Sequence, residues 1–234
     1  MRRAANNCGL DITRYRPDTT EAGRVARMLR HHRIDVVLDI GANIGQFALG
    51  LRRGGFVGKI VSFEPLKQAH DQLVTAARND PNWNIAPQMA IGEREGEIAL
   101  HVSGNSVSSS VLGMLESHSD AAPKSAYIAT QHVRMATLDS MVHDIIQADD
   151  SIFLKIDTQG YEDKVLNGSP ETLARASGLQ LELSFVPLYE GQQLFDALMS
   201  RVRALGFAPW AIQPGFCDPV SGRMLQVDVV LFRD

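Results

Sequence analysis

The sequence has no long apolar run and only two cysteines among its 234 residues. Because no stretch of about eighteen apolar residues occurs, no membrane-spanning helix is expected. The start of the chain, after Met1-Arg2-Arg3, also lacks the apolar core of a secretory signal peptide. Cys8 and Cys217 lie far apart and form no metal-binding pair, so we expect two free thiols. These absences make the cytoplasm the expected location.

The chain also has little positive charge. Its 23 lysines and arginines are outnumbered by 27 acidic residues, which gives a net charge of −4. This balance argues against a general nucleic-acid-binding protein. The charge is uneven, however, because residues 1–33 hold eight arginines and three acidic residues. A solvated helical face explains this basic arm, and docking on an anionic membrane surface or an acidic partner is the alternative.

Two phosphate-binding patterns are missing. No Lys-Ser or Lys-Thr follows the glycine turn described next, which disfavours a nucleoside triphosphate. The complete G-x-G-x-x-G pattern is absent as well, since Asn43 stands where its second glycine would approach a pyrophosphate. What is present is a short apolar run over 36–40, a turn from Gly41 to Gly45 and a helix that begins near Phe47. Such a strand, glycine turn and helix N-terminus form a nucleotide-type binding corner.

Apolar runs alternate with helical patterns along the rest of the chain. We expect strands over 36–40, 59–64, 84–90, 97–102, 151–157, 179–185, 207–212 and 226–232, and helices over 21–32, 45–53, 67–79, 137–147, 161–176 and 190–205. This alternation predicts an α/β fold with a mostly parallel sheet and right-handed crossovers. The last two strands leave no room for a crossover helix and should therefore be antiparallel.

Residues 103–131 interrupt this pattern, because they are rich in serine and show no clear period. We interpret them as a lid or an acceptor-binding loop, and simple disorder is the alternative. No internal repeat or domain linker is visible. The prediction is therefore one domain over 34–234, preceded by a basic arm and helix over 1–33.

Acidic residues lie at the ends of the first two strands. Asp39 would suit the ammonium group of S-adenosylmethionine, directly or through water. Glu64 closes the second strand, where a carboxylate can accept hydrogen bonds from both hydroxyls of a ribose. S-adenosylmethionine and NAD both present such a ribose, so these residues leave a methyltransferase and an NAD-type reductase open.

Five blocks of sequence stand out between about residues 36 and 186. They are Asp39-Ile40-Gly41-Ala42-Asn43-Ile44-Gly45-Gln46-Phe47, Phe63-Glu64-Pro65, Thr137-Leu138-Asp139-Ser140, Leu154-Lys155-Ile156-Asp157-Thr158-Gln159-Gly160-Tyr161-Glu162 and Val165-Leu166-Asn167-Gly168. Together they resemble the FkbM family of S-adenosylmethionine-dependent methyltransferases. The resemblance implies a class I methyltransferase (Rossmann-like) fold, with a seven-stranded, mostly parallel sheet, an antiparallel last strand and helices on both faces.

The resemblance also implies where S-adenosyl-L-methionine would bind. It assigns the glycine turn to the methionine part, the acid after the second strand to the ribose, and the residues after the third strand to the adenine. The predicted cofactor-binding residues are Asp39, Gly41, Ala42, Asn43, Gly45, Phe47, Glu64, Pro65, Ala90 and Ile91. Many members have Val-Glu where Thr158-Gln159 stands here, which removes one carboxylate from the rim of the site.

Methyl transfer to a hydroxyl is an in-line displacement that usually needs a base. Asp157 ends a largely apolar strand and is the predicted base. Lys155 shares its face of the strand and is expected to pair with it. Glu182 is a second charged residue on an apolar strand, where it could pair with Lys155 or face the site. Structural ion pairing of these acids is the alternative, and His132 is the reserve base.

No metal site is predicted. Asp157, Glu162 and Glu182 could together hold Mg²⁺, but no Asp-Asp pair or histidine cluster supports this. Capping of a helix is the expected role of Glu162. The expected function is O-methylation of a sugar hydroxyl, on a small-molecule or glycolipid acceptor such as a glycosylated secondary metabolite. Methylation of a polyketide or another small molecule, an NAD-type reductase and a non-catalytic cofactor-binding scaffold are the alternatives.

Overall fold

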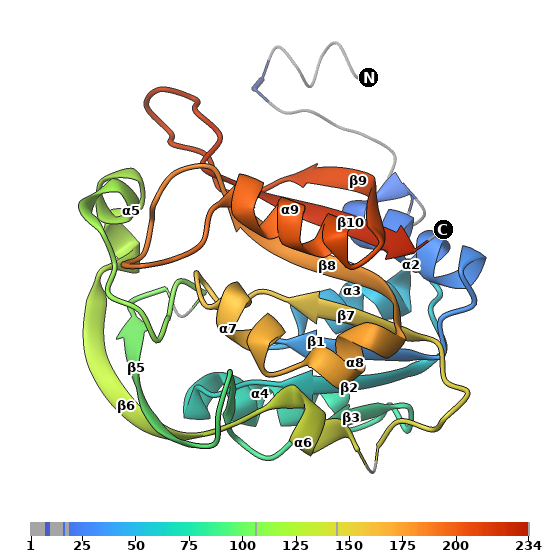
Figure 1. Ribbon diagram of the computed structural model, residues 1–234. Helices are drawn as coiled ribbons and strands as arrows, with labels where there is room; N and C mark the ends of the chain where they lie inside the picture. The colour runs from blue at the N-terminus through green and yellow to red at the C-terminus, as the bar shows by residue number, and fades with distance from the viewer. Residues whose placement is uncertain (1–7, 10–15, 17–18, 106, 144, 234) are drawn as a thin grey trace.

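The computed structural model describes residues 8–9, 16, 19–105, 107–143 and 145–233 (Figure 1). A seven-stranded sheet has the order β3 (Trp83–Ile85), β2 (Lys59–Phe63), β1 (Val36–Ile40), β7 (Ile152–Ile156), β8 (Ala176–Ser184), β10 (Gln226–Arg233), β9 (Phe207–Pro214). β10 runs antiparallel to both of its neighbours, and the other neighbouring strands pair in parallel. The prediction of a mostly parallel sheet with an antiparallel last strand is therefore confirmed.

Helices cover both faces of this sheet (Figure 1). One face carries α2 (Glu21–His31), α3 (Gln46–Arg53) and α4 (Lys67–Ala77), and the other carries α6 (Leu138–Val142), α7 (Glu162–Asn167), α8 (Pro170–Arg175) and α9 (Phe195–Ala204). Both faces are covered because successive apolar side chains of β1 point to opposite faces of the sheet. Val37 packs in the core of the first face, whereas Val36 and Leu38 pack in the core of the second. The predicted class I architecture is confirmed.

The prediction of one strand over 84–90 is wrong. This stretch forms β3 in the large sheet and, after a break, β4 (Ala90–Ile91) in a second sheet. Pro87 lies in the break. Proline has no N–H group to donate to a neighbouring strand, so it interrupts the ladder where the apolar pattern continues.

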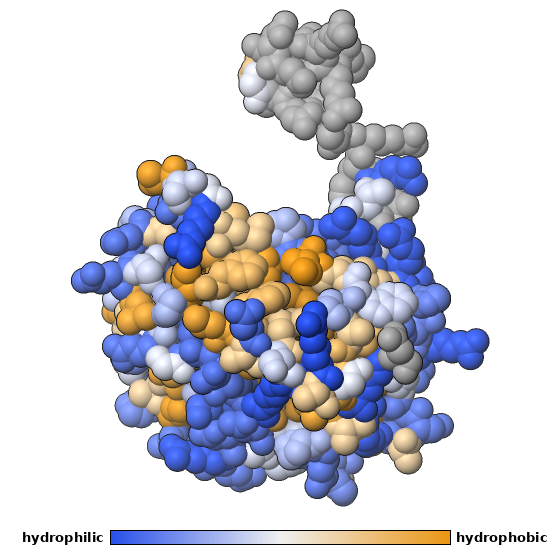
Figure 2. Space-filling view, turned by 45° about the horizontal axis from the view of Figure 1, so that its top comes forward, coloured by the Kyte–Doolittle hydropathy of each residue, from blue (hydrophilic) through white to orange (hydrophobic). Residues whose placement is uncertain are grey.

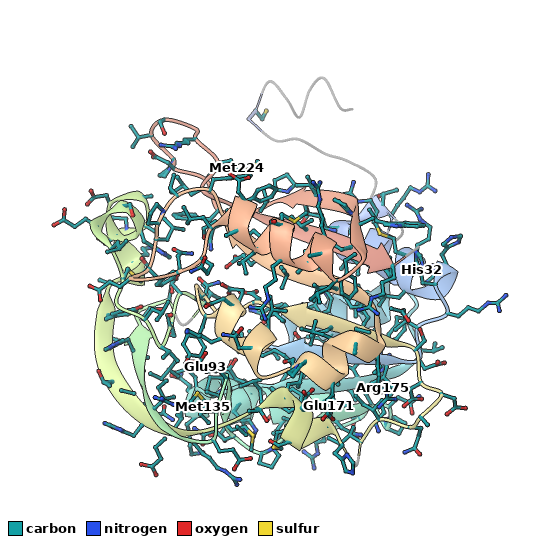
Figure 3. All side chains as sticks on the ribbon, viewed as in Figure 1. His32, Glu93, Met135, Glu171, Arg175 and Met224 are labelled. Atoms are coloured by element: carbon teal, nitrogen blue, oxygen red, sulfur yellow. The ribbon has the colours of Figure 1, made fainter. Side chains whose placement is uncertain are left out.

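The second sheet is small and has the order β4, β6 (Tyr127–Ala136), β5 (Gly96–Ser103). β4 pairs in parallel with the end of β6, and β5 pairs antiparallel with β6. Glu93 and Met135, labelled in Figure 3, lie where this sheet meets α7. The Glu93 carboxylate lies 3.3 Å from Nζ of Lys164, and Met135 Sδ accepts a 3.9 Å hydrogen bond from the hydroxyl of Tyr161. The small sheet is thus fixed to the large one.

The irregular segment expected over 103–131 is shorter in the structure. Its second half contains α5 (Glu116–Ala121), a short 3₁₀ helix η2 (Pro123–Ser125) and the first residues of β6. The first half is irregular but is fastened to the turn after β7, because the hydroxyl of Ser110 donates a 2.6 Å hydrogen bond to the carbonyl oxygen of Gln159. Simple disorder of 103–131 is therefore wrong for its described residues. The role of the segment as a lid or acceptor-binding loop stays a prediction.

Most of the predicted basic arm lies outside the described residues, and α2 is the part that the structure shows. Thr20 caps this helix, since its hydroxyl accepts a hydrogen bond from the N–H of Gly23 at 3.0 Å. α2 packs closely on α3, where a Cβ on Gly50 would lie 2.6 Å from that of Ala22. Within the described ranges, none of the helices combines the length and apolarity that a membrane span requires.

Hydrophilic side chains cover much of the surface, and apolar ones gather on the face that carries α9, β9 and β10 (Figure 2). Trp210 and Ile212 of β9 are among the exposed apolar residues. Next to them, the ring of His32 stacks on that of Phe232 with 3.8 Å between centroids, and Figure 3 labels His32 at this edge of the molecule. These ring contacts hold the end of α2 against the sheet.

Candidate active site

A cavity of about 370 Å³ lies at the carboxyl ends of the parallel strands. Its walls come from the glycine turn after β1, the ends of β2 and β7, the small sheet and the first turns of α2. Eight residues predicted to bind the cofactor line it: Gly41, Ala42, Asn43, Phe47, Glu64, Pro65, Ala90 and Ile91. In open α/β sheets this edge, beside the point where the strand order reverses, is where ligands bind.

The glycine turn lies directly against the end of β7. Gly41 has φ +76°, and a Cβ there would lie 1.8 Å from the carbonyl oxygen of Asp157. Gly45 has φ +91° and faces Trp83, whose ring would lie 2.7 Å from an added Cβ. Gly45 is not among the residues that line the cavity, so its backbone contact with the cofactor stays a prediction. Both positions require glycine, because the backbone of Asp157 at Gly41 and the ring of Trp83 at Gly45 occupy the space that a side chain would need.

Glu64 forms part of the cavity wall and is held by two backbone groups. Its Oε2 accepts a hydrogen bond from the N–H of Asn43 at 2.7 Å, and its Oε1 accepts one from the N–H of Leu66 at 2.8 Å. The side chain is 4 % exposed. Burial raises the pKa of Glu64 to about 7, although the two N–H groups favour the carboxylate. Glu64 is thus fixed in place, and near pH 7 its protonated and ionised forms are present in similar amounts.

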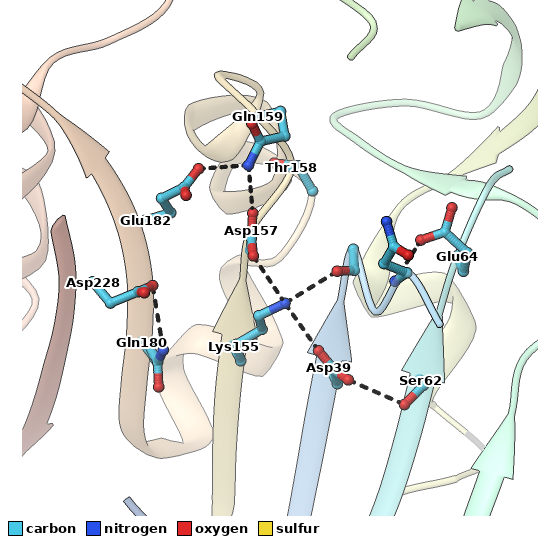
Figure 4. A network of polar contacts seen from close by, with 12 residues as sticks. Asp39, Ser62, Glu64, Lys155, Asp157, Thr158, Gln159, Gln180, Glu182 and Asp228 are labelled. Carbon is cyan, nitrogen blue, oxygen red and sulfur yellow. Dashed lines mark hydrogen bonds and ion pairs between the residues drawn. The ribbon is translucent and has the colours of Figure 1, made fainter. Parts of the chain in front are cut away.

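Asp39 lies beneath the turn rather than along the cavity wall. It is fully buried, its Oδ1 is 3.2 Å from Nζ of Lys155, and its Oδ2 accepts a 3.3 Å hydrogen bond from the hydroxyl of Ser62 (Figure 4). Burial raises the pKa of Asp39, while Lys155 opposes that rise. Contact of Asp39 with the cofactor ammonium stays a prediction, and its observed role is to anchor Lys155.

Lys155 joins three groups around the turn. Besides Asp39, its Nζ donates a 3.1 Å hydrogen bond to the carbonyl oxygen of Gly41 and lies 3.4 Å from Oδ2 of Asp157. Burial alone would lower the pKa of Lys155, but the charges of Asp39 and Asp157 raise it. Lys155 is therefore a cation, and its predicted pairing with Asp157 is confirmed.

Asp157 lines the cavity and is partly open to it. Its side chain is 32 % exposed, whereas that of Lys155 is 6 % exposed. Its Oδ1 accepts a 2.8 Å hydrogen bond from Nε2 of Gln159. Each carboxylate oxygen thus has a protein partner, and lone pairs remain for a ligand.

Gln159 is a site residue whose role the sequence did not reveal. Its Nε2 donates to Asp157 and, at 2.6 Å, to Oε2 of Glu182 (Figure 4). Its Oε1 accepts a 2.8 Å hydrogen bond from the hydroxyl of Tyr189. The sequence signal was the departure from the family pattern at 158–159, which we interpreted as a lost carboxylate. The carboxamide instead places a donor between two acids.

Glu182 lies behind Gln159 and outside the residues that line the cavity. Its Oε2 also accepts a 2.8 Å hydrogen bond from Nε2 of Gln226. Burial and the charges of Asp157 and Asp228 raise the pKa of Glu182 well above its usual value. Pairing with Lys155 was one of the two alternatives for Glu182, and the structure shows these carboxamide bonds in its place, while Lys155 pairs with Asp39 and Asp157. A direct role of Glu182 in catalysis stays a prediction.

Glu162 fastens the turn that precedes α7. Its Oε1 accepts hydrogen bonds from the N–H of Thr158 at 2.9 Å and of Gly160 at 3.2 Å. Burial raises the pKa of Glu162 to about 7. His132, the reserve base, is exposed on β6 and does not line the cavity. Within the part of the chain that the structure describes, no three histidine, cysteine or acidic residues are placed to hold a metal ion.

The cavity extends beyond Lys155 to residues that the sequence analysis did not single out. Glu21, Gln180, Gln213 and Asp228 line this end. Burial and the charge of Asp157 raise the pKa of Asp228 to about 6. The sequence pattern could not place these residues together, since they come from α2, β8, β9 and β10.

Comparison with known proteins gives one family match. The model of the family described as "Methyltransferase FkbM domain" matches residues 39–209. No curated protein matches the sequence. Similar solved structures include an rRNA methylase from Streptococcus thermophilus, at 13 % identity with 95 % of this chain and 99 % of that chain covered and a TM-score of 0.48. Another is TehB from Haemophilus influenzae, at 10 % identity, 91 % and 62 % coverage and a TM-score of 0.48. A third is the mitomycin 7-O-methyltransferase MmcR, at 11 % identity, 93 % and 54 % coverage and a TM-score of 0.47.

Proposed function

The chain belongs to the FkbM methyltransferase family, whose cofactor is S-adenosylmethionine, and from this membership we propose that it methylates a sugar hydroxyl of a glycolipid or glycosylated secondary metabolite. The observation that carries the proposal is the position of Asp157. This partly exposed carboxylate lines the same cavity as Glu64 and the glycine turn. An acceptor hydroxyl beside Asp157 would therefore lie next to the predicted cofactor site.

The residues of the cavity fit S-adenosylmethionine. Glu64 presents a fixed carboxylate of the kind that accepts hydrogen bonds from ribose hydroxyls. Leu66, Met89 and Ile91 supply an apolar wall beside it, which suits an adenine ring. When bound, S-adenosylmethionine supplies an electrophilic methyl group.

The proposed base is held in position by its neighbours. Lys155 lies beside one oxygen of Asp157, and Gln159 donates to the other. An acceptor hydroxyl that donates a hydrogen bond to Asp157 would pass its proton to the carboxylate as its oxygen attacks. Lys155 also bonds the carbonyl oxygen of Gly41, so the base and the glycine turn are held in one fixed geometry.

Mass spectrometry of metabolites from cells with and without the protein tests the proposed reaction. We expect a sugar-containing compound that is heavier by one methyl group when the protein is present. Calorimetry with the purified chain should show binding of S-adenosylhomocysteine. Binding of NADH without binding of S-adenosylhomocysteine would instead favour the reductase alternative.

Asp157→Asn is expected to slow methyl transfer about 100-fold, because the amide cannot accept the proton. The assay follows labelled methyl groups from S-adenosylmethionine into metabolites of cells that lack the protein. Asp196→Asn is the matched control, since Asp196 is exposed on α9 and is not among the residues that line the cavity. An active Asp157→Asn variant with an unchanged rate would contradict the assignment of the base. Absence of methyl transfer by the wild type would favour a cofactor-binding scaffold.

Affinity for S-adenosylhomocysteine is expected to increase as pH rises through about 7, where the buried Glu64 loses its proton. The carboxylate accepts hydrogen bonds from ribose hydroxyls, whereas the protonated acid loses part of that capacity. Glu64→Gln should bind about 10-fold more weakly at pH 8, a loss within the range for a hydrogen bond to a charged group, and should show a flatter pH profile. Calorimetry between pH 6 and 8 measures both effects, and an equal slope in the variant would exclude Glu64 as the cause.

A further inference from the structure

The cavity is lined by more negative than positive charge. Its charged residues are four acids and one base: Glu21, Glu64, Asp157, Asp228 and Lys155. An ammonium group has three N–H donors. Nζ of Lys155 donates to the carbonyl oxygen of Gly41 at 3.1 Å and forms ion pairs with Asp39 and Asp157 at 3.2 and 3.4 Å, so three protein groups already surround it. Among the described residues that line the cavity, an anionic acceptor, such as a phosphate ester or a nucleic acid, therefore meets no cation besides this surrounded lysine.

Two of the acids lie away from the predicted cofactor site. Glu21 and Asp228 line the cavity with Gln180 and Gln213, and we call these four residues the distal subsite. Asp228 is on β10, the third strand from β1 in the order β1-β7-β8-β10. Neighbouring strands lie about 4.8 Å apart, which puts β10 roughly 14 Å from β1. The distal subsite is thus placed for the acceptor rather than for the cofactor.

The distal subsite offers hydrogen-bond acceptors. Nε2 of Gln180 donates to Oδ1 of Asp228 at 3.3 Å, an orientation that keeps two oxygens from facing each other (Figure 4). Gln180 is 4 % exposed, and its buried Oε1 has no hydrogen-bond partner among the described residues. Nε2 of Gln213 is directed at the carbonyl oxygen of Glu21 at 3.5 Å. Because Oε1 of Gln180 is enclosed, the carboxylates of Glu21 and Asp228 in the cavity lining are the acceptors that a ligand here would meet, and the ligand must bring donors.

We propose that the distal subsite binds a protonated amine of the acceptor, which makes the acceptor an amine-bearing hydroxyl compound such as an amino sugar. This inference rests on the proposed methyl transfer. A hydroxyl brings a single donor and no charge, whereas an ammonium group brings three donors and a positive charge that matches Glu21 and Asp228. The shared cavity would then hold the amine at one end and present a neighbouring hydroxyl to Asp157.

Binding of three matched sugars to the full chain, saturated with S-adenosylhomocysteine, tests the inference. D-glucosamine is protonated at neutral pH, D-glucose has a hydroxyl in place of the amine, and N-acetyl-D-glucosamine has the amine blocked. Protein-detected NMR titrations at neutral pH should show glucosamine binding at least 10-fold more tightly than the other two. The absence of such a preference, including the absence of any binding, would overturn the inference.

Variants connect the preference to the distal subsite. Asp228→Asn and Gln180→Met are each expected to bring the affinity for glucosamine down to that for glucose. Asp196→Asn makes the same change of charge outside the cavity and should keep the preference. Equal behaviour of Asp196→Asn and Asp228→Asn would indicate a general charge effect and would also overturn the inference.

Titration with S-adenosylhomocysteine distinguishes a failure of the proposed function from a failure of the amine inference. A wild-type chain that binds no S-adenosylhomocysteine contradicts the proposed function. A chain that binds it but does not prefer the amine contradicts the amine inference alone. Binding of S-adenosylhomocysteine by the variants shows that they are folded.

Discussion

Gly41→Ala is expected to abolish binding of S-adenosylhomocysteine and to lower the free energy of unfolding by about 2–5 kcal/mol. A left-handed backbone costs a residue with a side chain about 1–2 kcal/mol, and overpacking of a closed site costs about 1–3 kcal/mol more. Gly41 has φ +76°, and its added Cβ would lie 1.8 Å from the carbonyl oxygen of Asp157, so the turn and the end of β7 must separate. That movement would also break the bond between Lys155 and the Gly41 carbonyl.

Gly191→Ala is the matched control for this prediction. Gly191 has a similar φ of +69°, but nothing lies within 4 Å of an added Cβ. It should therefore lose only the backbone term of about 1–2 kcal/mol and should keep its affinity for S-adenosylhomocysteine. Urea denaturation and calorimetry measure the two quantities. Equal losses in the two variants would show that the close approach of the turn to β7 has no energetic consequence.

Lys155→Met is expected to lower the free energy of unfolding by about 3–5 kcal/mol, because it leaves a buried charge without its partner. The stranded group is Asp39, which is fully buried and lies 3.2 Å from Nζ of Lys155. The double variant Asp39→Leu/Lys155→Met removes both charges and should recover part of the loss. Lys67→Met is the control, since Nζ of Lys67 pairs at 2.7 Å with the exposed Asp71, and should cost less than about 1 kcal/mol.

The loss in Lys155→Met should also depend on pH. Burial raises the pKa of Asp39 in the folded protein, and removal of Lys155 takes away the charge that opposes this rise. The folded variant therefore binds a proton more readily than the unfolded chain does, so a decrease in pH stabilises it relative to the wild type. We expect the difference in unfolding free energy to shrink as the pH falls from neutral, and a constant difference would contradict the role of Asp39.

The first half of the large sheet could be predicted because its signals are local. Apolar runs end at Gly41 and at Pro65, and each is followed by a helical pattern. Pro87 is a sequence signal for the break, but the apolar pattern continues on both sides of it. The pattern therefore does not indicate that β3 and β4 belong to different sheets. Local signals give the strands, and the partner of each strand depends on contacts that a local pattern does not contain.

The polar side of the site depends on such distant contacts. Gln159 bonds Glu182 and Tyr189, which are 23 and 30 residues further along the chain. Asp228 reaches the cavity because β10 inserts between β8 and β9. The short connection between the last two strands predicted that they are antiparallel, yet it could not say that the last one lies between β8 and β9. The pairing of Lys155 with Asp157 was predictable because the two residues are two positions apart at the end of one strand.

The small sheet begins and ends at the same place in the fold. Ala90 lies opposite Met135, and Ile91 lies opposite Ala136. Because these two strands run in parallel, the chain between them must form a crossover of at least about a dozen residues, and a longer crossover can begin and end at the same two points. Changes in the length of such an excursion cost little, since each doubling of a flexible loop adds about 0.6 kcal/mol of closure entropy. A change in the length of 92–134 would thus alter one wall of the cavity, while the glycine turn and Glu64 keep their positions.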